Sequence, residues 1–290
     1  MGFSLVLLFF PIFFEINLDI LYQIFFISII VSFPSLLEDF NYKINPYVRT
    51  FYQFITLSLF LIYFDNFTLS NIEIFYDIDS KYFLFFFTLF ALIGFINGLN
   101  FIDGINGLLI FYALIITTSL ILVINDSQIN VYLIFIIIHL FTFLYFNFPK
   151  AQMFIGDFGV NFLAVTLALL SIYLHNVNSV KVLFDDWYVA NLFCYPIYEI
   201  STSIIRRVLK RRSPFYPDKQ HLHSLLFEFI NLNTNLKHSI STFFIILLVS
   251  FFIILSIYSN ISNYLIFMCQ YMCLLISHIL IKKSLRQKIV

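Results

Sequence analysis

The chain has 290 residues, of which 61% are hydrophobic, 21% aromatic and only 11% charged. Its mean hydropathy is +0.94 and its formal net charge is zero. A soluble globular domain does not have this composition, so the chain is expected to bury its surface against lipid and against other helices.

Apolar runs of roughly 15 to 20 residues recur along the chain, long enough to cross a hydrocarbon layer of about 30 Å as helices. They predict about ten membrane segments, at 3–16, 20–37, 51–64, 82–96, 105–124, 131–148, 160–175, 188–208, 241–258 and 263–281. An acidic break at Glu15, Asn17 and Asp19 predicts a short hairpin loop after the first segment. Because no solenoid repeat or low-complexity linker is present, we predict an all-α polytopic membrane protein with one transmembrane domain over residues 1–290.

Lys and Arg residues predict the orientation of these segments, because they concentrate on the cytoplasmic side of a membrane. Ten crossings would place both termini and the even-numbered connections on one side, which receives 14 of the 16 basic residues. The other side holds nine acidic residues and only Lys81 and Lys181. We therefore expect a multi-pass protein of the plasma (inner) membrane, with both termini and the active site facing the cytoplasm.

Four polar clusters, far apart in the sequence, fall on this predicted cytoplasmic side. The first is Glu38 and Asp39, at the end of the second segment. Negative charge there opposes the dipole of that helix, so ordinary capping does not explain the pair. Adjacent carboxylates suit a Mg²⁺ site or a general base, and an ordinary acidic helix terminus is the alternative.

The second cluster is the Asn- and Gly-rich stretch 97–108, which contains Asp103. Turn chemistry alone accounts for its glycines. It does not account for a carboxylate directly before an apolar helix, where charge near the lipid is costly. A functional role is therefore expected for Asp103, and an N-cap is the structural alternative.

The third cluster places Asp157 between Gly156 and Gly159, before another apolar helix. Glycine permits close approach of a ligand to the backbone. A carboxylate at this position suits Mg²⁺, which uses one or two carboxylates together with substrate phosphates.

The fourth cluster begins with a basic run from Arg206 to Arg212 and ends with His221 and His223. The arginines alone are explained by membrane orientation or by contact with anionic lipid. The two imidazoles, beside Lys219 in a Pro-bounded loop, are predicted to donate to a substrate phosphate. A zinc site lacking its other ligands is the alternative.

In their residues and in their order along the chain, all four clusters resemble the motifs of the polyprenyl-phosphate N-acetylhexosamine-1-phosphate transferases, called glycosyl transferase family four. The resemblance covers about residues 33–225. The stretch SPFYPDKQHLH at 213–223 is similar to the branch that uses UDP-N-acetylglucosamine or related UDP-amino sugars. The phospho-N-acetylmuramoyl-pentapeptide transferases of the same superfamily tend to carry three successive histidines there.

The sequence departs from the family pattern in three places. Glu38 stands where the family typically has the first of two Asp residues, and Asn106 stands where a second acid often follows Asp103. The family also usually begins with a further helix and a basic cytoplasmic loop. Because the chain opens at Met1 with the apolar run that would correspond to the following helix, we expect an amino-terminally shortened form.

The resemblance implies transfer of a UDP-linked amino-sugar 1-phosphate, first of all N-acetylglucosamine 1-phosphate, to undecaprenyl phosphate with release of UMP. This reaction would initiate synthesis of a cell-envelope polysaccharide such as the O-antigen of lipopolysaccharide. The implied cofactor is Mg²⁺, with Mn²⁺ as a substitute. The implied partners are a UDP-amino sugar, a polyprenyl phosphate and the lipid bilayer, without nucleic acid; a homodimer is left open.

The resemblance also implies residue roles. Asp157 and Asp103 are expected to bind the metal, with Asn100 beside Asp103 serving the metal or the nucleotide. Asp39 is expected to position or deprotonate the attacking phosphate, while His221 and His223 hold the diphosphate. The full set of expected substrate-binding residues is Glu38, Asn97, Asn100, Asn106, Lys150, Arg212 and Lys219.

Three other functions compete with this prediction. One is an enzyme of the phospho-N-acetylmuramoyl-pentapeptide transferase type, and another is a truncated, inactive homologue. The third is a transporter. Acidic residues of transporters usually lie at the bilayer midplane on broken helices, whereas here they gather at one predicted face.

Overall fold

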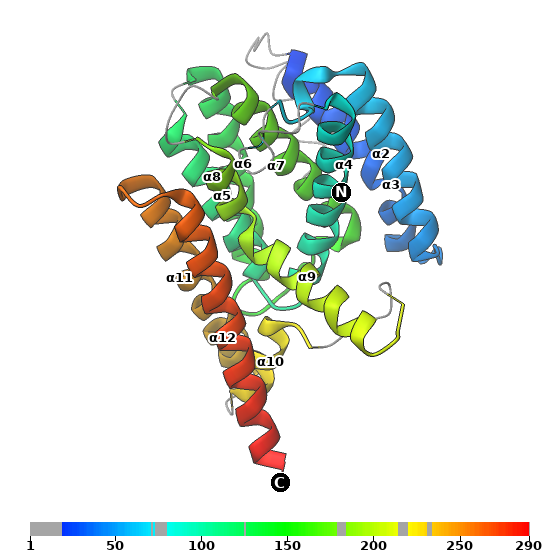
Figure 1. The fold of residues 1–290 in the computed structure, drawn as a ribbon. Helices are drawn as coiled ribbons and strands as arrows, with labels where there is room; N and C mark the ends of the chain where they lie inside the picture. The colour runs from blue at the N-terminus through cyan, green and yellow to red at the C-terminus, as the bar shows by residue number, and fades with distance from the viewer. Residues whose placement is uncertain are drawn as a thin grey trace.

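The computed structural model describes residues 19–70, 72, 80–124, 126–178, 184–213, 220–230 and 234–289. The predicted segment 3–16, Glu15 and Asn17 lie outside these residues. Within them the chain is helical and contains no β-strand (Figure 1). Six helices are long and apolar enough to cross a membrane: α2 (Asp19–Asp39), α4 (Lys81–Ile102), α6 (Ser127–Asn147), α7 (Gly156–Asn178), α11 (Thr234–Tyr258) and α12 (Asn263–Ile289). The protein is thus a multi-pass membrane protein.

The remaining helices are shorter or less apolar. They are α3 (Pro46–Tyr63), the 3₁₀ helix η1 (Asp65–Phe67), α5 (Leu108–Val123), α8 (Asp186–Leu192), α9 (Cys194–Leu209) and α10 (Leu222–Phe229). The six long helices coincide with six of the ten predicted segments, and the structure does not establish ten crossings.

The predicted segment 188–208 is wrong as a single helix, because it breaks at Phe193 between α8 and α9. Pro196 has no N–H and cannot donate to the carbonyl of Leu192 one turn earlier. That carbonyl instead accepts a hydrogen bond from the hydroxyl of Tyr112 on α5. The break therefore leaves no buried acceptor unpaired at this point, and α9 leaves the bundle at an angle (Figure 1).

Helix α7 lies in the centre of the bundle and packs chiefly against α2 and α4. A buried polar ladder ties the three helices together. Asn100 donates to Oδ1 of Asn161 at 2.7 Å, and Nδ2 of Asn161 donates to the hydroxyl of Ser35 at 2.5 Å. Because lipid offers no hydrogen bonds, polar groups in a membrane bundle must find partners in the protein, and here they hold the helices in register.

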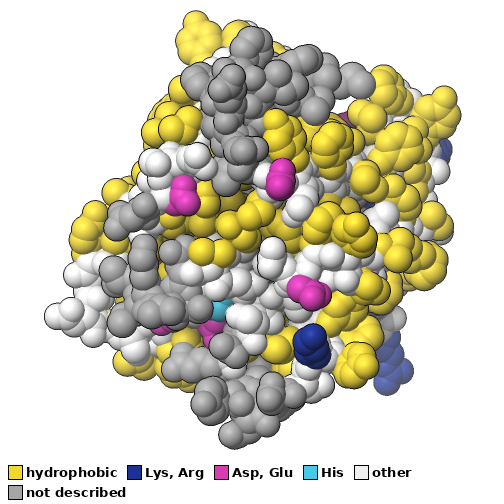
Figure 2. All heavy atoms as spheres, turned by 90° about the horizontal axis from the view of Figure 1, so that it is seen from above, with side chains coloured by type: hydrophobic (Ala, Val, Ile, Leu, Met, Phe, Trp, Pro, Cys, Tyr) yellow, Lys and Arg dark blue, Asp and Glu magenta, His cyan; other side chains and the backbone are white. Residues whose placement is uncertain are grey.

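The long helices alternate in direction, so that their ends meet at two opposite faces of the bundle. On one face α2 ends beside the start of α7, and the N–H of Gly107 before α5 donates to Asn147 at the end of α6, at 2.7 Å. On the other face His175 of α7 lies 2.6 Å from Asp186 of α8. Figure 2 looks down on that second face, where carboxylates lie among apolar side chains.

Candidate active site

Asp39, the last residue of α2, closes the first turn of α7. Its Oδ1 accepts the N–H of Asp157 at 3.0 Å, and its Oδ2 accepts the N–H of Phe158 at 3.2 Å. A carboxylate that accepts these free N–H groups is stabilised by the dipole of α7. The negative charge of Asp39 is unfavourable at the end of α2 but favourable at the start of α7, which explains its position. Asp39, and not Asp157, is therefore the residue that caps α7.

Gly156 makes this contact possible in two ways. Its φ of +72° lies in the left-handed region, which is costly for residues with a side chain. A Cβ at this position would also lie 2.6 Å from Oδ2 of Asp39. The glycine before Asp157 is thus required by backbone conformation and by the close approach of α2.

Glu38 is engaged by Arg49 of α3, whose Nη1 donates to Oε2 at 2.8 Å, with both side chains 18% exposed. Arg49 is also close enough to Asp157 to interact with its charge. The sequence indicated Arg49 only as a marker of membrane orientation. Its place beside two acids makes it a component of the site that sequence reasoning missed.

Asp103 follows α4 as its C-cap residue, while Gly107 precedes α5 with a φ of +78°. The alternative that Asp103 caps the following helix is therefore wrong. Among the described residues its carboxyl has no hydrogen-bond partner. Its side chain reaches solvent, but nearby protein atoms partly desolvate the carboxyl, and this desolvation, together with the charge of Asp157, raises the pKa of Asp103 to about 7.

Asp39, Asp103 and Asp157, here called the acidic cluster, converge from α2, α4 and α7. No group of three or more His, Cys, Asp or Glu side chains in the described part of the chain forms a ready metal-binding arrangement. Asp103 and Asp157 nevertheless fit Mg²⁺, because two carboxylates that repel one another and lack hydrogen-bond donors suit a hard cation that also takes substrate phosphates.

A second group, here called the histidine cluster, is formed by Glu199 of α9 with His221 and His223. Oε2 of Glu199 lies 2.9 Å from Nδ1 of His221, and its Oε1 accepts the N–H of Leu222 at 2.9 Å. Glu199 is fully buried. The two imidazole rings stack in parallel with centroids 5.4 Å apart. Glu199 thus fixes both the ring of His221 and the backbone beside it.

His223 lies in a different environment from a phosphate-binding imidazole. It is 1% exposed, and its Nδ1 lies 3.1 Å from the hydroxyl of Tyr195. Its Nε2 packs against Gly104, where no Cβ would fit. Burial lowers the pKa of His223 to about 4, against the opposing effect of Glu199, so the ring is neutral at pH 7. The structure gives His223 a packing role, and its contact with a diphosphate stays a prediction.

The zinc alternative for the two histidines finds no third ligand among the described residues. Instead, the ring of His221 belongs to a row of contacts that includes an aromatic ring and a cation. Phe101 lies 5.1 Å from His221, and the guanidinium of Arg207 lies 5.2 Å from the Phe101 ring. A cation over an aromatic face is favourable. These contacts join the second polar cluster, at the end of α4, to the fourth polar cluster, on α9 and before α10.

The side-chain amides that were expected to bind substrate donate hydrogen bonds to other atoms of the protein. Asn97 donates to the carbonyl of Ile93 at 2.8 Å, and Asn106 donates to the carbonyl of Pro149 at 3.0 Å. Asn100 belongs to the polar ladder described above. Lys150 and Arg212 are exposed at the same end of the molecule, and Lys219 lies outside the described residues. Direct contact of these residues with substrate stays a prediction.

Glu199 and Tyr195 were also missed by sequence reasoning. Glu199 stands inside the predicted apolar segment 188–208. The cost of a carboxylate near lipid, which drew attention to Asp103, applies equally to this position. That signal could have found Glu199, whereas Tyr195 carries no comparable signal.

A family model described as glycosyl transferase family 4 matches residues 21–175. The chain belongs to glycosyl transferase family 4. The matched span covers more than half of the chain and includes all three residues of the acidic cluster. The histidine cluster of this family 4 protein lies beyond the matched span.

Curated relatives each match a part of the family 4 chain. It is 30% identical over 164 residues to a probable undecaprenyl-phosphate N-acetylglucosaminyl 1-phosphate transferase of Bacillus subtilis, covering 56% of this chain and 44% of that protein. It is 33% identical over 131 residues to an undecaprenyl-phosphate alpha-N-acetylglucosaminyl 1-phosphate transferase of Thermotoga maritima, covering 45% and 39%. It is 38% identical over 112 residues to a phospho-N-acetylmuramoyl-pentapeptide-transferase of Latilactobacillus sakei, covering 38% and 35%. The matched part spans less than half of each relative.

Proposed function

We propose that this chain transfers an amino-sugar 1-phosphate from its UDP carrier to undecaprenyl phosphate, releases UMP, and so begins assembly of an envelope polysaccharide. N-acetylglucosamine 1-phosphate is the proposed group. The observation that carries the proposal is the convergence of the acidic cluster and the histidine cluster at one end of the bundle. The names of the Bacillus subtilis and Thermotoga maritima relatives support the choice of substrates.

In this reaction an oxygen of the acceptor phosphate attacks the sugar-linked phosphorus of the donor. The bond from that phosphorus to the bridging oxygen of UMP breaks, and UMP leaves with the electron pair. A bound Mg²⁺ would offset the charge of the diphosphate. We assign Asp103 and Asp157 as the carboxylates that would hold it, with Mn²⁺ as a substitute.

We assign Asp39 a positioning role. Both of its oxygens accept backbone N–H groups of α7, so it keeps Asp157 opposite Asp103. A general base is not required for the acceptor, because a phosphate monoester is largely ionised at neutral pH, with a second pKa of about 6. The prediction that Asp39 deprotonates the acceptor is untested and is not part of this mechanism.

His221 is the proposed donor to the diphosphate. Glu199 holds Nδ1 of the ring, which leaves Nε2 as the nitrogen for a substrate phosphate. His223 stacks in parallel on the ring, and Phe101 packs against it at a tilt of 39°, so both neighbours hold its plane. The substrate contact is thus assigned to one histidine, and the second supports it.

The site is proposed to face the cytoplasm, where nucleotide sugars are made, in a plasma membrane crossed about ten times. The basic residues at the site end support this orientation. The described ones are Lys43, Arg49, Lys150, Arg206, Arg207, Lys210, Arg211, Arg212, Lys237, Lys282, Lys283 and Arg286. A reporter fused after Val290 should be cytoplasmic, and one inserted between Asp65 and Asp79 should be external; two reporters on one side would contradict the ten-crossing topology.

A second candidate function is transfer of phospho-N-acetylmuramoyl-pentapeptide to the same lipid. The identity of 38% to the Latilactobacillus sakei protein favours it. The shared family does not separate the two donors, because both present a UDP-linked sugar phosphate to the same acceptor.

The test is an assay of the purified full chain in vesicles that contain undecaprenyl phosphate and Mg²⁺. Radiolabelled UDP-N-acetylglucosamine and the labelled UDP-pentapeptide donor are supplied separately, and labelled lipid and UMP are measured. Equal amounts of UMP and lipid-linked sugar from the first donor are expected. Turnover of the pentapeptide donor alone would establish the second candidate, and no UMP from any UDP-amino sugar would contradict a transferase.

A further inference from the structure

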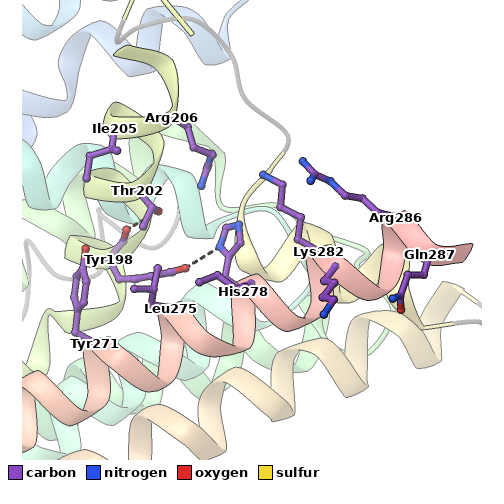
Figure 3. Close-up of a pocket in the computed structure, with 12 residues that line it drawn as sticks. Tyr198, Thr202, Ile205, Arg206, Tyr271, Leu275, His278, Lys282, Arg286 and Gln287 are labelled. Atoms are coloured by element: carbon purple, nitrogen blue, oxygen red, sulfur yellow. Dashed lines mark hydrogen bonds between the residues drawn. The ribbon is translucent and has the colours of Figure 1, made fainter. Parts of the chain in front are cut away.

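A cavity of 1010 Å³ lies between α9 and α12, outside the two clusters of the candidate site. Its walls are apolar and aromatic, formed by Ile205 of α9 and by Tyr271, Leu275 and Ile279 of α12. Figure 3 shows Ile205, Tyr271 and Leu275 among the residues that line it. Ile205 and Ile279 are 54% and 56% exposed, so these walls open toward the surroundings of the bundle. In a membrane protein such walls face acyl chains.

One end of this cavity is basic. Arg206 of α9 and Lys282, Lys283 and Arg286 of α12 line it, and Figure 3 shows Arg206, Lys282 and Arg286 at the end away from Tyr271. The twelve described lining residues include no acidic side chain. Apolar walls that lead to a cluster of cations match a ligand with an apolar body and an anionic head.

The cavity uses a different face of α9 from the candidate site. Tyr198, Thr202, Ile205 and Arg206 follow one helical stripe, whereas Glu199, Ser203 and Arg207 follow the adjacent buried stripe. Gly98 of α4 packs directly on Pro196, on the side of α9 toward the site. A ligand in the cavity is therefore separated from the acidic cluster by α9, which favours a supporting lipid over a reacting one.

We propose that the cavity between α9 and α12 binds one anionic phospholipid of the membrane. An acyl chain lies along Ile205, Leu275 and Ile279, and the headgroup phosphate lies among Arg206, Lys283 and Arg286. Arg206, from the basic run of the fourth cluster, thus binds this lipid together with the basic residues at the end of α12. This inference does not depend on the proposed transferase activity.

Two contacts connect the cavity to the histidine cluster. Nζ of Lys282 donates to Oε1 of Gln220 at 2.9 Å, and Gln220 directly precedes His221. The hydroxyl of Tyr198 lies 2.7 Å from Nδ1 of His278, and Tyr198 directly precedes Glu199. The wall of the cavity is therefore joined by direct contacts to the loop that carries His221 and to the turn of α9 that carries Glu199.

Native mass spectrometry of the full chain in a neutral detergent tests the proposal. The protein is titrated with phosphatidylglycerol and, separately, with phosphatidylcholine of the same acyl chains. The wild-type chain is expected to retain one phosphatidylglycerol with about tenfold or greater preference. The K283Q/R286Q variant should lose most of that preference, because each basic group contributes substantially to attraction of an anionic lipid.

The matched control is the K43Q/K81Q variant, which loses the same charge at two exposed positions on other elements, between α2 and α3 and at the start of α4. It should keep the preference for phosphatidylglycerol. A second variant, Ile279→Trp, fills the apolar wall without changing charge and should weaken phosphatidylglycerol binding about tenfold. It tests the same site independently if the charge variant does not fold.

Four results would overturn the proposal. Equal retention of the two phospholipids by the wild-type chain would exclude a headgroup site, as would equal loss of preference in the control variant. Displacement by inorganic phosphate at the same concentration would indicate a simple anion site. One-for-one displacement by undecaprenyl phosphate, with a raised KM for that acceptor in K283Q/R286Q, would make the cavity part of the acceptor site.

Discussion

The acidic cluster and the histidine cluster lie at the same end of the bundle but differ in how their charges are satisfied. Asp103 and Asp157 face each other, exposed to solvent, with no hydrogen-bond donor to their carboxyls among the described residues. Glu199, His221 and His223 are buried and hydrogen-bonded to one another or to their neighbours. The carboxyls of Asp103 and Asp157 can therefore bind a ligand, whereas the buried carboxylate of Glu199 holds the neighbouring side chains in place.

This contrast separates residues expected to matter for chemistry from residues expected to matter for shape. Substitutions in the acidic pair should change activity more than stability. Substitutions in the histidine cluster should change stability as well, because they leave buried groups without partners.

The largest effect is expected for Asp157→Asn, which should lower transferase activity by about a hundredfold or more. The α7 cap is supplied by Asp39, so the fold should be kept and thermal unfolding in detergent should change by less than about 2 °C. Asp65→Asn, at the opposite end of the bundle, is the matched control and should be fully active. Activity of Asp157→Asn within about threefold of wild type would assign the metal to other residues and remove the contrast.

Glu199→Ala should destabilise the protein by about 3 kcal/mol, because the N–H of Leu222 and the ring of His221 lose a buried acceptor. Glu199→Gln keeps one oxygen for the N–H of Leu222 and should cost less than half as much. Denaturation in detergent measures both. An Ala variant as stable as wild type would show that the histidine cluster does not depend on Glu199.

Asp103→Asn should stabilise the protein by about 1 kcal/mol at pH 8 in the absence of divalent cations, while lowering activity. The folded pKa of about 7 exceeds the usual value of 3.8, so the native state holds its proton more tightly than the unfolded state. The wild type therefore loses stability as pH rises from about 4 to 7. Solvent contact keeps the effect well below the full value of such a shift.

The measurement is a pair of unfolding curves for wild type and Asp103→Asn at several pH values. The stability difference should be absent below about pH 4 and complete above about pH 7. A difference that does not vary with pH would show that ionisation of Asp103 is not its cause.

The smallest effect is expected for Glu38→Gln, which breaks the ion pair with Arg49. Partly exposed ion pairs contribute at most about 1 kcal/mol, so stability should change by no more than that and activity should stay within about threefold. Arg49→Gln serves as the companion variant. A tenfold loss of activity in Glu38→Gln, with stability unchanged, would mean that Glu38 contacts substrate and belongs with the chemically active acids.

The sequence predicted the long apolar helices well and the connections within the site less well. The predicted segments 20–37 and 131–148 agree with α2 and α6 to within about four residues. The predicted meeting of sequence-distant clusters is confirmed where Asp39 caps α7 and where Gly104 packs on His223. The break at Phe193 was missed, because the hydropathy of 188–208 is continuous across it.

What the sequence by itself determined is the class of protein, the long helices and the gathering of the polar clusters at one end of the bundle. A membrane span is a local property, since its apolar length and internal hydrogen bonds are set by consecutive residues. The helix that Asp39 caps, the partner of Glu38 and the role of Glu199 were decided only by the tertiary structure. Each depends on which helix ends meet and in what register, and residues separated by 118 positions, such as Asp39 and Asp157, acquire their electrostatic partners only when the helices pack.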